Sequence, residues 1–351
     1  MLELIDISWI GERWSLASLP NGEPVSLFIW RDRDIDTSAR CGDVLPAIVK
    51  SIDRAGGMGF VDLSAGEQAF FNISKSRTPP VDGAHINVSV RAEAYRDKLA
   101  NVSPASGPPI TQSENDARDA WLERLPGYSD LTDEFSFGQK AEMCRAAFDA
   151  ALASTVTIDN GGKLHFDYTR ALTAIDVDSS GRVQRSGVPG LNTDALATAA
   201  RQINLRGLAG LFVVDLEGAP KGEKAKGLAA QFETKLKALT GRTVRVLPPS
   251  AFGLIEATVA RREKPLFEFA TETCSAERLT LEAFLSAMRE ALTLVESDRS
   301  AFFTLKTSVA LTEYMKQTAF DWQGELKART GGRIKWGPLN KTGLDYQIEL
   351  I

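Results

Sequence analysis

Alternating apolar and polar positions dominate the start of the chain. Three such runs, Glu3–Trp9, Arg13–Leu19 and Pro24–Trp30, are separated by short turns, and Pro20–Asn21–Gly22 has the composition of a tight turn. A period of two residues is typical of strands that bury one face. The pattern predicts a small antiparallel β-meander over residues 1–38.

A second group of short strands follows over residues 39–103. About five strands separated by Gly- and Pro-containing turns suit a small closed barrel of the OB type. Ser103–Pro109 is rich in Ser, Pro and Gly, so we expect a linker over residues 104–113. The strand runs are Val44–Ile52, Met58–Leu63, Gln68–Ile73 and Ile86–Ala94.

Two apolar runs in the middle of the chain end in aspartates. They are Ala174–Ser179, which contains Asp176 and Asp178, and Gly210–Leu216, which contains Asp215. Runs of this length are typical of buried strands. The stretch between them, Asn192–Leu205, has helical periodicity, so we expect a crossover helix that makes the two strands parallel neighbours.

The remaining segments complete two further units. We expect an α/β subdomain over residues 171–273 and a small C-terminal α/β domain over 279–351. The predicted helices are Glu114–Leu125, Gln139–Leu152, Pro220–Lys237, Gly253–Val259, Leu281–Val295 and Val309–Ala328, and the strands are Thr155–Asp159, Lys163–Asp167, Thr243–Leu247, Ala301–Thr307, Arg333–Trp336 and Leu344–Leu350.

Asp176 and Asp215 are the strongest candidates for chemistry. Carboxylates at the carboxyl ends of neighbouring strands lie at the edge of the sheet where α/β folds bind ligands. Mg²⁺ uses one or two protein carboxylates and keeps several waters, so Asp176 and Asp215, with Asp178 as a further candidate, suffice for it and favour a phosphate substrate. The alternative is that each aspartate only caps a helix or closes a turn.

Charge and composition narrow the function. The net charge is −5 and the pI is about 5.4, which argues against a surface that binds nucleic acid everywhere and favours a local site. No run approaches the roughly 18 apolar residues of a membrane span, and three isolated cysteines without a leader pattern favour the cytoplasm. Only His85 and His165 occur, and we expect His165 to be a packing or surface residue rather than a general base.

Three segments resemble the bacterial ribonuclease E/G family. They are Ala171–Ser179 (ALTAIDVDS), Ala200–Leu216 (ARQINLRGLAGLFVVDL) and Phe252–Glu256 (FGLIE). The resemblance implies that Asp176 and Asp215 hold a catalytic Mg²⁺, or Mn²⁺, in a DNase I-like subdomain. It also implies an RNase H-like subdomain made by residues 1–38 and 110–170. Asp178 replaces the asparagine that the family usually has.

The barrel is similar to the RNA-binding OB domain of the same family. The similarity rests on Gly59–Leu63 followed by Gln68–Phe71. It implies that Phe60 and Phe70 stack on RNA bases and that Lys98 makes a basic contact. In a regular strand Phe71 points to the other side, toward the core.

Further basic residues are candidates for RNA contacts. Arg182 and Arg185 lie in a Gly-containing loop after the first aspartate strand, where they could bind phosphate bidentately. The resemblance adds Arg206 and Lys224. Ala251 stands where the family usually has an arginine, which implies that one basic contact near the substrate is lost or replaced.

Two family features are missing from the sequence. The Arg–Thr signature of the 5′-phosphate sensor has no counterpart, so dependence on a 5′-monophosphate is not expected. Cys274 matches the first cysteine of the family's zinc link, but Ser275, Ala276 and Glu277 follow it. One thiolate per chain is short of the four ligands of a structural zinc, so we expect no zinc and no zinc-linked homodimer.

Our leading hypothesis is a magnesium-dependent endoribonuclease that cleaves single-stranded RNA and leaves 5′-phosphate ends. The alternatives are a non-catalytic RNA-binding or regulatory paralogue and a metal-dependent enzyme acting on another phosphoester. Retention of Asp176 and Asp215 favours the nuclease, whereas Asp178, Ala251 and the missing sensor favour the paralogue.

Overall fold

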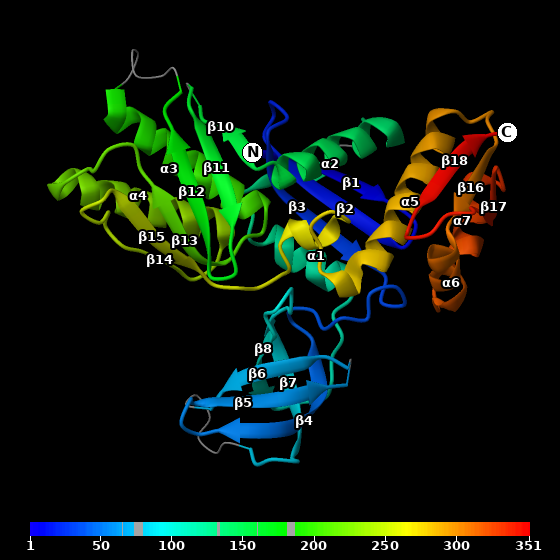
Figure 1. The fold of residues 1–351 in the computed structure, drawn as a ribbon, viewed down its shortest axis with the longest axis horizontal. Coiled ribbons are helices and arrows are strands. Elements are labelled where there is room, and N and C mark those ends of the chain that lie inside the picture. The colour runs from blue at the N-terminus through cyan, green and yellow to red at the C-terminus, as the bar shows by residue number, and fades with distance from the viewer. Residues whose placement is uncertain (65, 74–79, 132–133, 160, 181–186) are drawn as a thin grey trace.

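The computed structural model describes residues 1–64, 66–73, 80–131, 134–159, 161–180 and 187–351. They form a four-stranded sheet, a closed five-stranded barrel, a six-stranded sheet and a three-stranded sheet. In Figure 1 the six-stranded sheet lies on the left, the C-terminal elements lie on the right, and the barrel projects below. The mixed α+β architecture and the closed barrel agree with the predicted fold class, while the DNase I-like arrangement stays a prediction.

The N-terminal meander forms where the alternating pattern predicts it. Strands β1 (Leu2–Ser8), β2 (Glu12–Ser18) and β3 (Pro24–Arg31) are antiparallel, and β9 (Tyr128–Leu131) joins β1 as a parallel edge strand. Gly22 in the β2–β3 turn has a φ of 84°, a left-handed conformation that glycine adopts without steric cost.

Two helices pack on this sheet. α1 (Glu114–Leu122) contacts β3, and α2 (Phe137–Leu152) contacts β1, β2 and β3. Each begins with a serine capping box, from Ser113 and Ser136, which satisfies backbone N–H groups at the helix start. Their packing places residues 110–152 beside the meander.

The barrel consists of five short strands in the order β4-β5-β6-β8-β7. Alternate residues fill its interior, including Val61, Phe71 and Val102, which are at most 2% exposed. The strands are β4 (Val44–Asp53), β5 (Met58–Leu63), β6 (Gln68–Asn72), β7 (His85–Ala92) and β8 (Ala100–Ala105).

The linker begins later than the sequence predicts. Residues Ser103, Pro104 and Ala105 belong to β8, because they pair with Ser89, Val88 and Asn87 of β7. Pro104 is tolerated in this strand because β8 pairs only briefly on its other side, through Ala100 and Asn101 with β6.

The six-stranded sheet has the order β10-β11-β12-β13-β15-β14. β12 and β13 are parallel, connected by α3 as predicted, and the other neighbours are antiparallel. α3 and α4 cover one face and share its core. The elements are β10 (Thr155–Thr157), β11 (Lys163–Tyr168), β12 (Leu172–Asp178), α3 (Gly187–Leu205), β13 (Gly210–Asp215), α4 (Gly222–Thr240), β14 (Val244–Val246) and β15 (Leu254–Val259).

The predicted helix at Gly253–Val259 is wrong. The segment forms strand β15 between β13 and β14, with Ile255, Ala257 and Val259 buried. Its period of two and its β-branched residues outweigh helix propensity once two neighbouring strands can pair with it.

The C-terminal residues form a three-stranded sheet with three helices. The predicted single helix Val309–Ala328 is two helices, because Thr318 leaves α6 in an extended conformation and Asp321 caps α7 by accepting a hydrogen bond from the Gly324 N–H at 2.9 Å. The elements are α5 (Leu279–Ser297), β16 (Phe303–Thr307), α6 (Val309–Gln317), α7 (Trp322–Thr330), β17 (Ile334–Pro338) and β18 (Tyr346–Leu350), preceded by 3-10 turns at Leu266–Phe269 and Ala276–Arg278.

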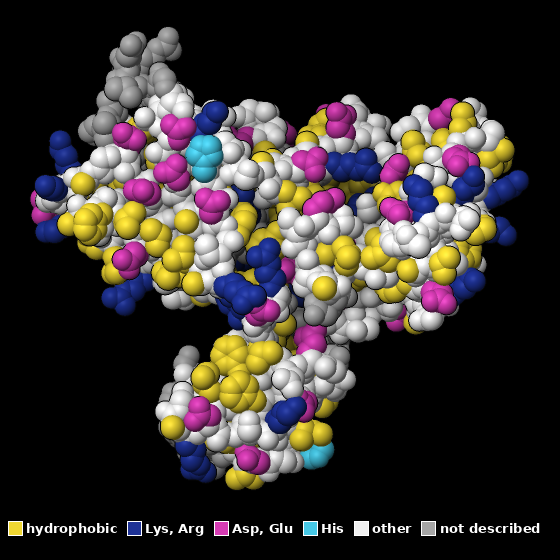
Figure 2. Space-filling view, in the orientation of Figure 1, with side chains coloured by type: hydrophobic (Ala, Val, Ile, Leu, Met, Phe, Trp, Pro, Cys, Tyr) yellow, Lys and Arg dark blue, Asp and Glu magenta, His cyan; other side chains and the backbone are white. Residues whose placement is uncertain are grey.

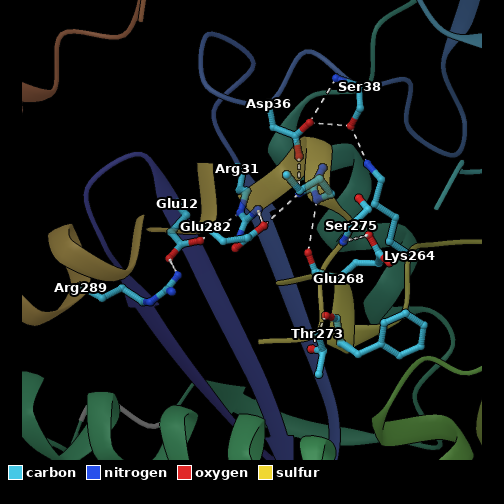
Figure 3. Close-up of polar contacts among 12 residues, drawn as sticks. Glu12, Arg31, Asp36, Ser38, Lys264, Glu268, Thr273, Ser275, Glu282 and Arg289 are labelled. Atoms are coloured by element: carbon cyan, nitrogen blue, oxygen red, sulfur yellow. Dashed lines mark hydrogen bonds and ion pairs between the residues drawn. The ribbon is translucent and has the colours of Figure 1, made fainter. Parts of the chain in front are cut away.

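A buried ion network joins the N-terminal sheet to α5. Figure 3 shows Glu12, Arg31 and Glu282 in a chain of contacts that continues to Arg289 on one side and toward Asp36 on the other. Apolar residues of β1, β2, α2 and α5 form one shared core around it. The two ends of the chain therefore fold onto each other.

Candidate active site

Asp176 and Asp215 lie side by side on the face of the six-stranded sheet that α3 and α4 leave uncovered. They are direct partners in the parallel pairing of β12 with β13. Ile175 and Val214, their neighbours in sequence, are at most 1% exposed and point to the helices, so both aspartates point to solvent. The crossover topology expected from the sequence brings the two carboxylates together.

His165 lies beside this pair. It is the partner of Asp176 in the antiparallel pairing of β11 with β12, and its Nε2 is 3.8 Å from the Asp178 carboxylate. Its Nδ1 is 3.0 Å from the Thr155 hydroxyl. Sequence reasoning did not place His165 beside the acids, and the hairpin register between β11 and β12 is the signal that could have placed it there.

Asp178 has local partners of its own. Its carboxylate accepts hydrogen bonds from the Ser180 N–H at 2.9 Å and from the Ser180 hydroxyl. These hydrogen bonds, with a smaller contribution from His165, lower the pKa of Asp178 below its ordinary value. Asp178 is thus held as a carboxylate next to the pair.

A further acidic residue on the open face, Glu256, was not singled out by the sequence. Glu256 in β15 is opposite Val213 and diagonal to Asp215, and it is exposed. Figure 2 shows acidic side chains gathered around a histidine on this part of the surface. Across the part of the chain that the structure describes, no group of three or more His, Cys, Asp or Glu side chains converges as a metal site.

The pair Asp176 and Asp215 fits the donor set of a magnesium ion. Mg²⁺ is bound through one or two carboxylates and keeps the rest of its shell as water and substrate phosphate oxygens. Two solvent-facing carboxylates in register supply the protein ligands and leave room for water and for a substrate phosphate.

The exposed side chain of Phe252 is another feature near the pair. It is 85% exposed in the turn before β15, next to Ala251. This turn is tied to the end of β13, because the Leu216 N–H donates to the Gly253 carbonyl at 3.3 Å.

Phe60 and Phe70 form a cross-strand pair on the outside of the barrel. They are partners in the pairing of β5 with β6, and both are partly exposed. Phe71 is fully buried in the barrel core. The structure therefore places the two predicted stacking residues side by side and Phe71 on the opposite side of the strand.

Lys98 lies where the barrel meets the six-stranded sheet. It lines a cavity of about 380 Å³ together with Tyr95, Arg170 and Leu211, and its Nζ is 5.4 Å from the centre of the Tyr95 ring. Arg96, also at this junction, is the one non-glycine residue in the described ranges with a positive φ, at 49°.

The other basic residues predicted to contact RNA differ in their exposure. Arg206 is 1% exposed, donates to the Tyr168 hydroxyl at 2.8 Å and lies 4.1 Å from the centre of the Phe166 ring. The prediction that Arg206 contacts RNA is therefore wrong, because its side chain is buried against Tyr168 and Phe166 of β11. Lys224 is exposed in the first turn of α4, and Arg182 and Arg185 lie outside the described residues.

No helix among the described residues is long and apolar enough to cross a membrane. Cys41, Cys144 and Cys274 are free cysteines. Burial raises the pKa of the Cys274 thiol to about 11, and nearby Glu282 and Glu268 act in the same direction.

The segment that contains the acid pair matches a known protein family. The Ribonuclease E/G family model matches residues 131–262, a range that includes β12, β13 and β15. Among curated proteins, ribonuclease E of Nostoc sp. is 31% identical over 135 residues, which cover 37% of this chain and 20% of that protein. Ribonuclease E of Escherichia coli is 29% identical over 36% of this chain and 12% of its own length.

A chloroplastic ribonuclease E/G-like protein of Arabidopsis thaliana is 30% identical over 36% of this chain and 13% of its own length. The matched segments thus span about a fifth or less of these three relatives. Among solved structures, a multidomain protein with nucleic acid binding domains from Streptococcus pneumoniae is 19% identical over 43% of this chain and 58% of that chain, with a TM-score of 0.18, too low to support an argument about fold. Over residues 131–262, this chain is therefore similar to the ribonuclease E/G family.

Proposed function

We propose that the protein is a magnesium-dependent endoribonuclease that cleaves single-stranded RNA. The observation that carries this proposal is the in-register, solvent-facing pair Asp176 and Asp215 inside the segment that matches the family. Asp176 lies inside β12, Asp215 is the last residue of β13, and neither caps α4, whose N-cap is Lys221.

Asp176 and Asp215 would hold the metal ion. Bound there, Mg²⁺ supplies positive charge to the scissile phosphate and lowers the pKa of a coordinated water. His165 and Asp178 lie beside the pair and contact each other. The side chain of His165 is held by Thr155, and that of Asp178 is held by Ser180.

The substrate strand would run from the barrel to the open face of the sheet. Phe60 and Phe70 present an aromatic pair for base stacking, which tolerates any sequence. Lys98 lies next to Leu211, and Leu211 is four residues, or about 13 Å along the strand, from Asp215. A path of this length accommodates a few nucleotides between the junction and the acids.

The chemistry is a hydrolysis. Water adds to phosphorus while the bond from phosphorus to the 3′-oxygen breaks and that oxygen takes up a proton. The products are a 5′-phosphate on one fragment and a 3′-hydroxyl on the other. Fragments with 2′,3′-cyclic phosphate ends would contradict this course.

The test is cleavage of a 5′-labelled single-stranded RNA with Mg²⁺, Mn²⁺ or EDTA. We expect metal-dependent cutting that Asp176→Asn and Asp215→Asn each lower by roughly 10²-fold or more. Asp167→Asn is the matched control, because Asp167 is exposed on the same face of the sheet but is opposite Ala174 rather than an acid. Equal loss in all three variants would contradict the proposed site.

A non-catalytic RNA-binding protein is the second candidate. The burial of Arg206 favours it, because it removes one of the basic substrate contacts expected near the acids. Tight binding of the same RNA without cutting in any metal would establish it. Cleavage of small phosphodiesters without affinity for RNA would instead indicate an enzyme acting on another phosphoester.

A further inference from the structure

A second and larger cavity lies away from the acid pair. It has a volume of about 510 Å³, and its lining includes residues of β3, α1, the loop at residues 40–42 and the segment at residues 262–266. This volume lies in the range of small-molecule sites and suits a ligand of nucleotide size.

The cavity and the acids are at opposite ends of the same sheet. Asn204 and Thr240, at the ends of α3 and α4, line the cavity. α3 runs back from the end of β12 to the start of β13, whereas Asp215 is the last residue of β13. A ligand in this cavity therefore would not touch the candidate active site.

The lining is strongly basic in a chain of net negative charge. Seven of the lining residues are Arg or Lys and three, Asp36, Glu93 and Glu263, are acidic, whereas the whole chain has a net charge of −5. A concave surface lined by one sign of charge attracts ligands of the opposite sign.

Three of the arginines share one carboxylate. Glu263 accepts from Arg124 and Arg242 at 2.8 Å each, and its carboxylate is 3.2 Å from Arg262 Nε. Burial opposes ionisation of Glu263, but the three guanidinium groups outweigh it and lower its pKa. One carboxylate balances one of three positive charges, so two remain for an anion.

Arg40 provides an unused donor. Its side chain is 8% exposed, lies 4.0 Å from the centre of the Trp30 ring and donates through Nη2 to the Asp36 carbonyl at 2.9 Å. Its Nη1 is buried and has no hydrogen-bond partner among the described residues. Burial lowers the pKa of Arg40 to about 10, so a buried positive charge remains at neutral pH for an anion to stabilise.

We propose that this cavity binds the phosphate group of a small phosphorylated molecule no larger than a nucleotide. Arg40 and the arginines around Glu263 supply charge-assisted hydrogen bonds to the phosphate oxygens. The aromatic rings of the lining are already in use, since Arg40 covers Trp30 and Phe28 stacks on Trp121 with centroids 5.7 Å apart. Recognition therefore rests on the phosphate rather than on base stacking.

The first test measures binding to the purified full chain by calorimetry and thermal shift. The probes are inorganic phosphate and adenosine 5′-monophosphate, with adenosine as the uncharged comparison. We expect both phosphates to bind and adenosine not to bind. Arg242→Gln and Arg262→Gln are expected to weaken binding by roughly tenfold or more, as loss of a charge-assisted hydrogen bond requires.

Two controls separate this site from surface charge and from the nuclease. Arg299→Gln removes an arginine that is 83% exposed outside the cavity, and it is expected to leave binding unchanged. Asp215→Asn is expected to bind the phosphates like the wild type, so failure of the proposed nuclease would leave this result intact.

A second readout does not depend on arginine variants that could disturb folding. Cys41 lines the cavity, and in a Cys274→Ser chain it is the remaining cysteine that is not fully buried. Labelling of Cys41 by a maleimide at alkaline pH is expected to slow in the presence of adenosine 5′-monophosphate.

Three results would overturn the proposal. They are no binding of either phosphate at millimolar concentration, equal protection of Cys41 by adenosine, and protection by a 5′-phosphorylated RNA but by neither small phosphate.

Discussion

Arg31 of β3 and Glu282 of α5 form a buried two-pronged ion pair across 251 residues of sequence. Arg31 Nη2 is 2.6 Å from Glu282 Oε2, and both side chains are at most 1% exposed. Arg31 also reaches Glu12 of β2 at 3.2 Å. The guanidinium therefore ties the N-terminal sheet to the C-terminal domain, with hydrogen bonds that offset the desolvation of the charges.

Glu282→Ala is expected to destabilise the protein by about 3–5 kcal/mol, because it removes the two-pronged partner of a buried guanidinium and leaves Glu12 as its one remaining carboxylate contact among the described residues. Urea unfolding measures this change. Glu349→Ala is the control, since Glu349 pairs with Lys306 at 2.6 Å but is half exposed, and its loss is expected to cost about 1 kcal/mol or less. Equal effects of the two substitutions would show that the buried pair contributes no more to the free energy of unfolding than the exposed pair does.

Phe60→Ala and Phe70→Ala are each expected to weaken binding of single-stranded RNA by about 1–3 kcal/mol, the value of one base stacked on an aromatic ring. Fluorescence anisotropy with a labelled RNA measures the affinity. Ile48→Ala removes another apolar side chain from the barrel surface, 46% exposed in β4, and should leave the affinity unchanged. Unchanged binding in both Phe variants would place the RNA elsewhere.

Ser180→Ala is expected to raise the pKa of Asp178 toward its ordinary value, because it removes the hydroxyl that stabilises the carboxylate. A folded pKa below the unfolded value stabilises the protein above the ordinary Asp pKa, and this stabilisation is lost as the pH falls through the folded pKa. Carboxyl ¹³C NMR titration measures the shift.

The matched control is Ser300→Ala. Ser300 donates to Asp298 in the same way, through its N–H at 2.9 Å and its hydroxyl at 2.7 Å, and lowers the pKa of that carboxyl. Its removal should shift Asp298 and leave Asp178 unchanged. An Asp178 pKa that is indifferent to Ser180→Ala would assign the shift to the Ser180 N–H and His165 instead of the hydroxyl.

Gly59→Ala is expected to destabilise the barrel by about 1–3 kcal/mol through overpacking. A Cβ at residue 59 would lie 2.9 Å from Ile52 Cδ1 and closer still to the Phe71 ring in the barrel core. Gly138→Ala is the control, because open space surrounds that position in α2 and alanine favours the helix by up to about 1 kcal/mol. Thermal unfolding of both variants checks the contrast.

We expect the purified protein to contain no stoichiometric zinc, because Cys274 supplies a single thiolate per chain. Elemental analysis after dialysis is the measurement. About half an equivalent of zinc per chain would contradict the prediction and would indicate a metal-linked dimer.

Local patterns predicted much of the candidate site. Alternation placed Phe60 and Phe70 on the face opposite Phe71, and a helix between two apolar runs made β12 and β13 parallel. Parallel pairing at this register is enough to bring Asp176 next to Asp215. Local patterns gave the wrong prediction at two places. Residues 253–259 form a strand because neighbouring strands pair with them, and the helix predicted over residues 309–328 is divided in two because Asp321 caps a second helix.

The spacing of apolar residues over short stretches is enough to predict β12, β13, the helix between them and the pair of aspartates at their ends. Tertiary structure alone decided that His165 lies opposite Asp176, that Arg206 packs beneath β11, and that arginines from distant segments converge on Glu263. Burial and the pairing of charges depend on contacts between residues far apart in sequence, and no local period encodes those contacts.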